Sequence, residues 1–180
     1  GDDVRISNVA LMFTDLKGST SLYEAIGDAA AYRLVRDHFA YLTDVVEAQR
    51  GTLIKTMGDA IMAAFSDGAD AVTAGILLQA DVADFNQGRD DGGVVLKIGL
   101  HHGSCIAVTA DGRLDYFGSM VNLAARLQGE SRGGDIVLST ALADAVSPEI
   151  LGQSTGDFDM NSDSATLRGF KEPVAFWRMT

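Results

Sequence analysis

The sequence predicts a single domain of mixed α/β or α+β fold, and three observations lead to this. Short apolar runs of the length of buried strands alternate with longer segments whose apolar residues recur at helical spacing. Two of the strand-like runs are separated only by Met57, Gly58 and Asp59, which is typical of an antiparallel hairpin. The chain has 180 residues, of which 47% are hydrophobic, and this is enough for one substantial core. We therefore expect a mixed sheet with helices on one or both faces.

The first third of the chain predicts a strand, two helices and the hairpin. Residues 9–14 form a compact apolar run with a polar exit, as in a short buried strand. From residue 19 to about residue 49 the apolar residues follow a helical period, and Gly27-Asp28 in the middle indicates that one helix ends and another begins. The strands of the hairpin are expected at residues 52–56 and 60–65.

The remainder alternates in the same way. Residues 67–86 are rich in Ala and Leu with a helical period, and residues 122–127 read as a helical turn after a loop. The expected strands are residues 94–100, 105–108 and 136–138, with a short helix behind the last. No strand is assigned to the polar stretch at residues 159–164, and the tail closes with residues 174–178.

Charge and composition exclude several classes of function. With 14 basic and 25 acidic residues the net charge is -11, so the surface as a whole repels nucleic acid and anionic membranes. The single cysteine, Cys105, excludes a disulfide framework and fits a reducing compartment. No apolar run approaches the roughly 20 residues that span a bilayer, and no signal peptide opens the chain. We expect a cytoplasmic domain over residues 1–180, cut from a longer protein because it begins with Gly1, without nucleic-acid or direct membrane contact.

The segment FTDLKGST, residues 13–20, follows the first predicted strand. Asp15 stands where the strand ends, and the Gly-Ser-Thr that follows opens a helix. A carboxylate beside a glycine-containing helix N-terminus can hold Mg²⁺ and a polyphosphate together. The same residues also describe a simple turn in which Ser19 or Thr20 caps the helix, and the spacing of a Walker A loop is missing. Taken alone, the segment leaves both interpretations open.

A second carboxylate, Asp59, lies in the hairpin segment KTMGD. Taken alone, Asp59 is an ordinary turn residue and Lys55 an ordinary cation at a strand edge. Together with Asp15, however, Asp59 gives two carboxylates at the tips of strands. A site that transfers a phosphoryl group with two metal ions requires such a pair.

A third segment, LDYFGSMVNLAARL, combines an amide, a guanidinium and a carboxylate. On a helix, Asn122 and Arg126 lie on one face, where both can reach the same anion. The alternative is an ion pair between Arg126 and a neighbour such as Glu130 on the surface. Asp115, seven residues before Asn122, can accept a hydrogen bond from a nucleobase.

The segments FTDLKGST, KTMGDAIMAAF and LDYFGSMVNLAARL, in this order and spacing, resemble the catalytic domain of class III nucleotidyl cyclases, the adenylyl and guanylyl cyclases. The resemblance covers essentially the whole chain, including residues 167–170. It implies a ferredoxin-like palm, with a mixed and mainly antiparallel sheet flanked by helices. The signature of the related diguanylate cyclases is absent, because Gly133-Gly134-Asp135 is followed by Ile and Val.

The resemblance also implies roles for the residues that match the family's motifs. Asp15 and Asp59, with the Leu16 carbonyl, would bind two Mg²⁺ or Mn²⁺ ions. Lys55 and Asp115 would select adenine, since lysine donates to a ring nitrogen and the carboxylate accepts from the 6-amino group. The residues expected to act on the ribose and the phosphates are Asn122, Arg126, Lys17, Gly18, Ser19 and Thr20. Arg113 and Arg168 join the phosphate-binding candidates by their proximity to the motifs.

The implied reaction converts ATP to 3',5'-cyclic AMP and pyrophosphate. In this family, the metal-binding aspartates and the residues for the base and the transition state belong to opposite subunits. Because this chain carries both sets, the resemblance implies a homodimer with two shared, head-to-tail active sites and an inactive monomer. Members are commonly fused to sensor domains, so we expect a fused regulatory domain.

Two other functions stay open at this stage. A guanylate cyclase would face guanine, whose carbonyl replaces the amine of adenine and would meet the carboxylate of Asp115 with the wrong polarity. A non-catalytic module that binds nucleotide or only dimerises would be expected to have lost a metal-binding aspartate, Asn122 or Arg126. This chain has lost none of them.

Overall fold

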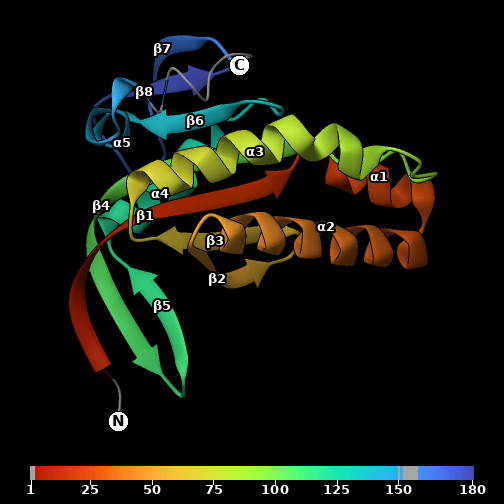
Figure 1. Cartoon of the computed structure of the whole chain (residues 1–180), viewed down its shortest axis with the longest axis horizontal. Coiled ribbons are helices and arrows are strands. Elements are labelled where there is room, and N and C mark those ends of the chain that lie inside the picture. The colour runs from red at the N-terminus through yellow and green to blue at the C-terminus, as the bar shows by residue number, and fades with distance from the viewer. Residues whose placement is uncertain (1–2, 150, 152–157) are drawn as a thin grey trace.

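The computed structural model describes residues 3–149, 151 and 158–180. One eight-stranded sheet has the order β2-β3-β1-β4-β6-β8-β7, with β5 paired to β4 outside that path (Figure 1). The strands are β1 Asp3–Leu16, β2 Gly51–Met57, β3 Ala60–Phe65, β4 Leu96–Ala110, β5 Arg113–Phe117, β6 Ile136–Ser139, β7 Met160–Ala165 and β8 Val174–Met179. The helices are α1 Ser19–Ile26, α2 Asp28–Ala48, α3 Gly68–Asn86, α4 Ser119–Gly129 and α5 Thr140–Ala145.

The sheet is mixed and mainly antiparallel, as the sequence and the resemblance predict. Among the described strands, the β4–β6 pair alone is parallel. Helices cover both faces because successive residues of β1 point in opposite directions. Ala10 and Met12 join a core with α2 and α3, whereas Leu11 and Phe13 join a second core with Met120 of α4.

Several predicted boundaries are confirmed. Gly27 separates α1 from α2, and its positive φ of 85° is a conformation that glycine adopts without strain. The hairpin turns at Gly58, where φ is 64°. The N-terminus of α3 is capped by Asp67, whose carboxylate accepts a hydrogen bond from the amide of Ala69 at 2.9 Å.

The prediction of two strands at residues 94–100 and 105–108 is wrong, because both belong to the continuous strand β4. The intervening residues stay in the ladder with β1, where His102 faces Ala10 and Ser104 faces Asn8. Gly103 makes no turn: a Cβ at this position would lie 2.9 Å from the Met120 side chain. The glycine therefore serves the close approach of α4 to the sheet.

Two further strands were not predicted. Residues 113–117, expected as a loop, form β5 and pair with β4 from Ala110 back to Ile106. Residues 160–165, four of which are polar, form β7, which pairs with β8 alone among the described strands. An edge strand of this kind keeps one side in water, so its polar composition carries no hydrophobic signal of a strand.

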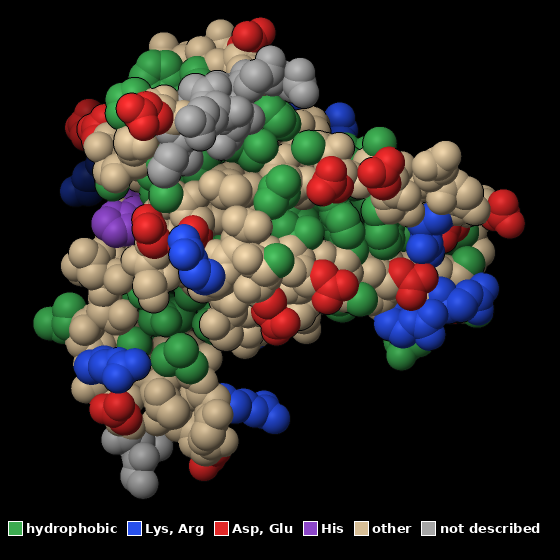
Figure 2. Space-filling view, in the orientation of Figure 1, with side chains coloured by type: hydrophobic (Ala, Val, Ile, Leu, Met, Phe, Trp, Pro, Cys, Tyr) green, Lys and Arg blue, Asp and Glu red, His purple; other side chains and the backbone are tan. Residues whose placement is uncertain are grey.

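The beginning of β1, the end of β4 and β5 form a three-stranded arm that projects from the body of the domain (Figure 1). Along this arm Ile6 faces Ile106, which in turn faces Phe117. These three side chains are 81%, 42% and 52% exposed, so the arm presents an apolar row to solvent. Figure 2 shows acidic side chains spread over the visible face and basic ones in separate groups, in agreement with the negative net charge.

Candidate active site

Asp15 stands at the end of β1, with its neighbours Thr14 and Leu16 buried. The amide of Leu16 donates to Asp15 Oδ1 at 2.8 Å, which fixes the orientation of the carboxylate. The next amide, that of Lys17, donates to the carbonyl of Val95 at 2.9 Å and so ties the exit of the strand to the segment before β4. The backbone around Asp15 is thus held on both sides.

Asp59 reaches the same place from the tip of the β2–β3 hairpin. The β1–β3 ladder brings Thr14 opposite Ile61, and the carboxylates of Asp15 and Asp59 are hydrogen-bonded to each other. The phenol of Tyr23, in α1, donates to Asp59 Oδ2 at 2.6 Å. The pair of carboxylates that the sequence predicts therefore does form.

The electrostatics of this pair are unusual for surface aspartates. Burial, followed by the hydrogen bond and charge of Asp59, raises the pKa of Asp15 to about 6. Burial acts to raise the pKa of Asp59. Hydrogen bonds with Asp15, Tyr23 and Ser19 lower it by more, so the pKa of Asp59 lies below the usual value. Near pH 6 the two carboxyl groups share one proton, since two like charges at this distance repel each other.

This donor set fits a divalent cation. Two carboxylates that compete for one proton carry more negative charge than their surroundings neutralise, and carboxylate oxygens are preferred ligands of Mg²⁺ and Mn²⁺. Within residues 3–149, 151 and 158–180, no group of three or more His, Cys, Asp or Glu side chains could hold a metal ion. Asp15 and Asp59 therefore suit a metal that keeps waters and also binds substrate phosphates, as Mg²⁺ commonly does.

The start of α1 is not the simple capped turn that the sequence left open. Gly18 occupies the N-cap position with φ of 66°, and no side chain caps the helix. Ser19 instead hydrogen-bonds to Asp59 and Tyr23, and Thr20 is exposed. The uncapped amides at this N-terminus suit an anion, and Lys17 is exposed next to them.

Lys97 is a cation of this site that the sequence analysis missed. It lies on β4 directly opposite Asp15, and its charge acts to lower the pKa of that carboxyl group. In the sequence, Lys97 stands out only as a lone lysine within an apolar strand. The register between β1 and β4 is what places it opposite Asp15. That register was not predicted.

Lys55 and Asp115 meet although they lie on different hairpins. Lys55 Nζ and Asp115 Oδ2 form an ion pair at 2.9 Å, with the two side chains 41% and 30% exposed. Asp115 Oδ1 also accepts from the amide of Tyr116 at 2.8 Å. A donor and an acceptor thus stand side by side, each partly open to solvent.

Asn122, Arg126 and Arg168 line one cavity of about 340 Å³, together with Ser119, Gly169 and Phe170. The alternative ion pair between Arg126 and Glu130 is absent from the described residues, and the carbonyl of Glu130 instead accepts from Arg178 at 2.9 Å. Arg178 also forms a buried ion pair with Asp135 at 2.7 Å. This pair anchors the C-terminal end of α4, the helix that carries Arg126.

Arg113 does not join this cavity. It lines a separate groove of about 540 Å³ together with Lys55 and their neighbours on β2 and β5. Its contact with a terminal phosphate stays a prediction. Within one chain, Arg113 lies beside Lys55.

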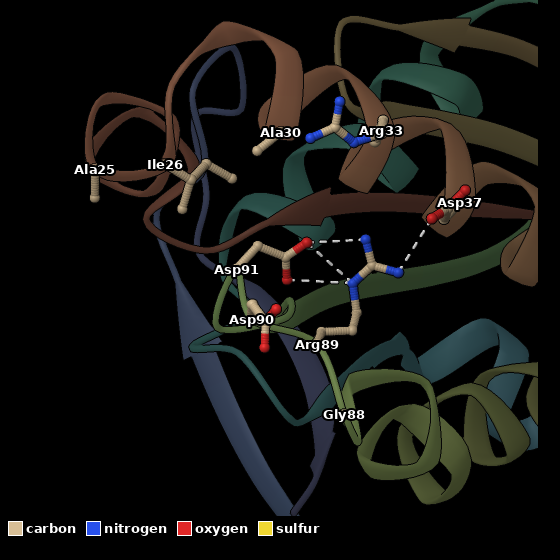
Figure 3. A pocket seen from close by; sticks show the side chains of 9 residues that line it. All are labelled: Ala25, Ile26, Ala30, Arg33, Asp37, Gly88, Arg89, Asp90 and Asp91. Atoms are coloured by element: carbon tan, nitrogen blue, oxygen red, sulfur yellow. Dashed lines mark hydrogen bonds and ion pairs between the residues drawn. The ribbon is translucent and has the colours of Figure 1, made fainter.

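A further cavity, of about 550 Å³, lies between α1, α2 and residues 88–91, and contains no predicted site residue (Figure 3). Its guanidinium, Arg89, is already bound to Asp91 at 2.9 Å and to Asp37 at 3.2 Å. The size of this cavity alone does not make it the candidate active site.

The predicted residues thus form three groups within one chain: the Asp15–Asp59 pair, the Lys55–Asp115 pair and the Asn122 cavity. No hydrogen bond or ion pair among the described residues joins the first group to either of the others. Asp59, Lys55 and the pair of Asn122 and Arg126 line three separate hollows of the described structure.

Comparison with known proteins shows the family of the chain. Residues 2–179 match the adenylate and guanylate cyclase catalytic domain family. The chain belongs to this family. It is a class III cyclase domain by sequence, and members of the family generally use divalent metal ions.

Individual relatives support the same conclusion. An uncharacterised protein of Mycobacterium tuberculosis is 32% identical over 97% of this chain and 42% of its own length. An adenylate cyclase of Mycosarcoma maydis is 36% identical over 74% of this chain and 6% of its own length. The crystal structure of the adenylyl cyclase CyaB from P. aeruginosa has a TM-score of 0.81, covers 99% of this chain and 96% of that one, and is 23% identical, which shows the shared fold.

The chain therefore spans less than half the length of these two relatives. Over the described residues, no helix is both long and apolar enough to cross a membrane.

A cation must compete with the shared proton of the aspartate pair, so metal affinity should depend on pH. Because burial and then Asp59 raise the pKa of Asp15 to about 6, Mn²⁺ affinity should fall about tenfold per pH unit below pH 6. Titration of the protein with Mn²⁺, followed by water proton relaxation, measures this. An affinity that stays constant from about pH 5 to 7 would contradict the assignment.

The same shift has a defined effect on stability. The pKa of Asp15 is about 6 in the folded protein and therefore higher than its ordinary value of 3.8, so the folded state binds more protons between these two pH values. The contribution of Asp15 to the free energy of unfolding should therefore decrease as the pH rises through about 6. In the Asp59→Asn variant, this dependence should move to lower pH.

Proposed function

We propose that this chain is the catalytic domain of an adenylate cyclase that converts ATP to 3',5'-cyclic AMP and pyrophosphate in a homodimer. The observation that carries the proposal is the formation of the Asp15–Asp59 pair and the Lys55–Asp115 pair in one chain that also keeps Asn122 and Arg126. The relatives named adenylate cyclase support the reaction. The chain spans only part of those proteins.

The Lys55–Asp115 pair supports adenine as the base. Adenine offers an acceptor at a ring nitrogen and a donor at its 6-amino group, which match the ammonium of Lys55 and the carboxylate of Asp115. Guanine has a carbonyl at position 6, which would face the carboxylate and leave polar groups unpaired once the bound base excludes water from them. Such a mismatch costs about 1 to 3 kcal/mol for each unpaired group.

Asp15, Asp59 and the Leu16 carbonyl would hold two Mg²⁺ or Mn²⁺ ions. When bound, such ions lower the pKa of the ribose 3'-hydroxyl and neutralise phosphate charge. The amides of Gly18, Ser19 and Thr20 would face the phosphates, with Lys17 and Lys97 as cations on either side of Asp15. This arrangement lets a protein of net charge -11 bind a polyanion.

Asn122 and Arg126 would act on the reacting centre. In the proposed reaction the ribose 3'-hydroxyl oxygen bonds to the α-phosphorus, loses its proton, and pyrophosphate leaves. The Asn122 amide would position the ribose, and the Arg126 guanidinium would stabilise the negative charge on the α-phosphate. Arg168, in the same cavity, would bind the departing phosphates.

A second copy of the chain would complete the site. Asp15 and Asp59 of one copy would face the Lys55, Asp115, Asn122 and Arg126 of the other, and the reverse, which gives two equivalent sites. The apolar row of Ile6, Ile106 and Phe117 supports this association, because exposed apolar side chains of this size are typical of an interface. A two-fold dimer uses the same surface of both copies and closes on itself.

The identity of the product tests the proposed function. The protein should be incubated with Mn²⁺ and either ATP or GTP at a concentration that permits dimerisation, and the products analysed by mass spectrometry. We expect cyclic AMP from ATP, and none from the Asp15→Ala variant. The absence of a cyclic nucleotide from ATP would refute the enzyme, whereas cyclic GMP as the main product would refute only the roles of Lys55 and Asp115.

The cavity around Asn122 gives a second prediction, with a matched control. Replacing Arg168 by Ala removes a guanidinium from beside Arg126, and we expect kcat/KM for ATP to fall about 10- to 100-fold, the value of one charged hydrogen bond. Arg33→Ala removes the same charge from an exposed position in the cavity between α1, α2 and residues 88–91, which holds no predicted site residue, and should change kcat/KM less than about threefold. Equal losses, or a larger loss for Arg33→Ala, would contradict this placement of the phosphates.

A further inference from the structure

Tyr23 is the one phenol within the described residues that hydrogen-bonds to a carboxylate of the candidate metal site. Its hydroxyl donates to Asp59 Oδ2 at 2.6 Å, a short distance that is characteristic of a bond from a hydroxyl to a charged acceptor. Tyr23 lies on α1, one turn after Ser19, whose hydroxyl contacts the same carboxylate. Two donors from one face of α1 therefore converge on Asp59.

The consequence for Asp59 is a fixed carboxylate plane. A carboxylate at a hairpin tip can rotate about χ1 and χ2, and Gly58 beside it adds backbone freedom. With Oδ2 held by Tyr23, that rotation is restricted. Both carboxylate oxygens then have a defined direction in which to meet a metal ion.

The same bond, together with the Ser19 contact, joins α1 to the β2–β3 turn. No residue of α1 is fully buried, so this short helix is held by partly buried contacts such as those of Leu22 and Ile26. The Tyr23 bond connects α1, which carries the uncapped amides, to the β2–β3 turn, which carries Asp59. Both would face the same metal-bound phosphates.

We propose that Tyr23 is a positioning residue that orients the Asp59 carboxylate for binding divalent cations. This inference rests on the proposed metal-binding role of Asp15 and Asp59. Groups that hydrogen-bond to metal ligands fix their orientation, and their loss typically reduces metal affinity about 10- to 100-fold. The competing explanation is that Tyr23 only fastens α1 to the hairpin, which would affect stability but not affinity.

The chain offers a matched control for the experiment. Tyr23→Phe removes one hydroxyl and keeps the ring. Tyr32→Phe makes the same chemical change on α2, at a residue that is 69% exposed, lines the same surface hollow and has no hydrogen bond within the described residues. Both variants should be titrated with Mn²⁺ without nucleotide, with binding followed by water proton relaxation.

We expect Tyr23→Phe to bind Mn²⁺ about 10- to 100-fold more weakly than the unaltered protein, and Tyr32→Phe to bind it equally well. The rise in thermal midpoint that Mn²⁺ produces should shrink in Tyr23→Phe alone, because ligand stabilisation follows affinity. For cyclisation of ATP, the Mn²⁺ concentration giving half-maximal rate should rise in Tyr23→Phe more than the KM for ATP.

The outcomes separate this inference from the proposed function. A lower thermal midpoint with unchanged Mn²⁺ affinity would show that Tyr23 is only a structural fastener, and would overturn the inference while leaving the cyclase intact. Tighter Mn²⁺ binding by Tyr23→Phe would also overturn it, by showing that the bond withholds Asp59 from the metal. If the unaltered protein binds no Mn²⁺ with or without ATP, both the inference and the proposed metal site fail.

Discussion

The arrangement of two aspartates at the end of the central strand is the constraint on which the candidate site depends. Asp15 and Asp59 are adjacent because β1 pairs with β3 on one side, while its pairing with β4 on the other places Lys97 opposite Asp15. Burial and mutual repulsion make this pair costly without a cation, as the raised pKa of Asp15 indicates. The surrounding hydrogen bonds, from Leu16, Ser19 and Tyr23, hold the two groups in place against that repulsion.

The sheet also keeps the other residues of the proposed reaction away from this pair within one chain. Asp115 lies on the projecting arm, and Arg126 lies on α4, whose C-terminal end is anchored through Glu130 and the buried Arg178–Asp135 pair. Rigid elements therefore fix each group separately. A dimer would bring the aspartates of one copy next to Asp115 and Arg126 of the other. Activity would therefore depend on association of the two copies as well as on the residues themselves.

Much of this was accessible from the sequence because it depends on local patterns. Apolar spacing and Gly27 located the helices, Gly58 located the hairpin, and the spaced motifs indicated the family. The continuity of β4 through Gly103 was missed because that glycine serves the packing of α4, a contact between distant segments. β7 was missed because an edge strand needs no apolar alternation. Lys97 and Tyr23 were missed because strand register and helix orientation, which no single segment encodes, bring them to the aspartates.

The central claim is that one active site is built from two copies of the chain, and mixing two inactive variants tests it most directly. Asp15→Ala lacks a metal-binding aspartate and Arg126→Ala lacks the guanidinium, so each should be inactive alone. When subunits exchange, half of the dimers would be mixed, and each would hold one intact site, so cyclic AMP synthesis should recover to about a quarter of the unaltered rate. No recovery in a mixture shown to contain mixed dimers would contradict the shared site.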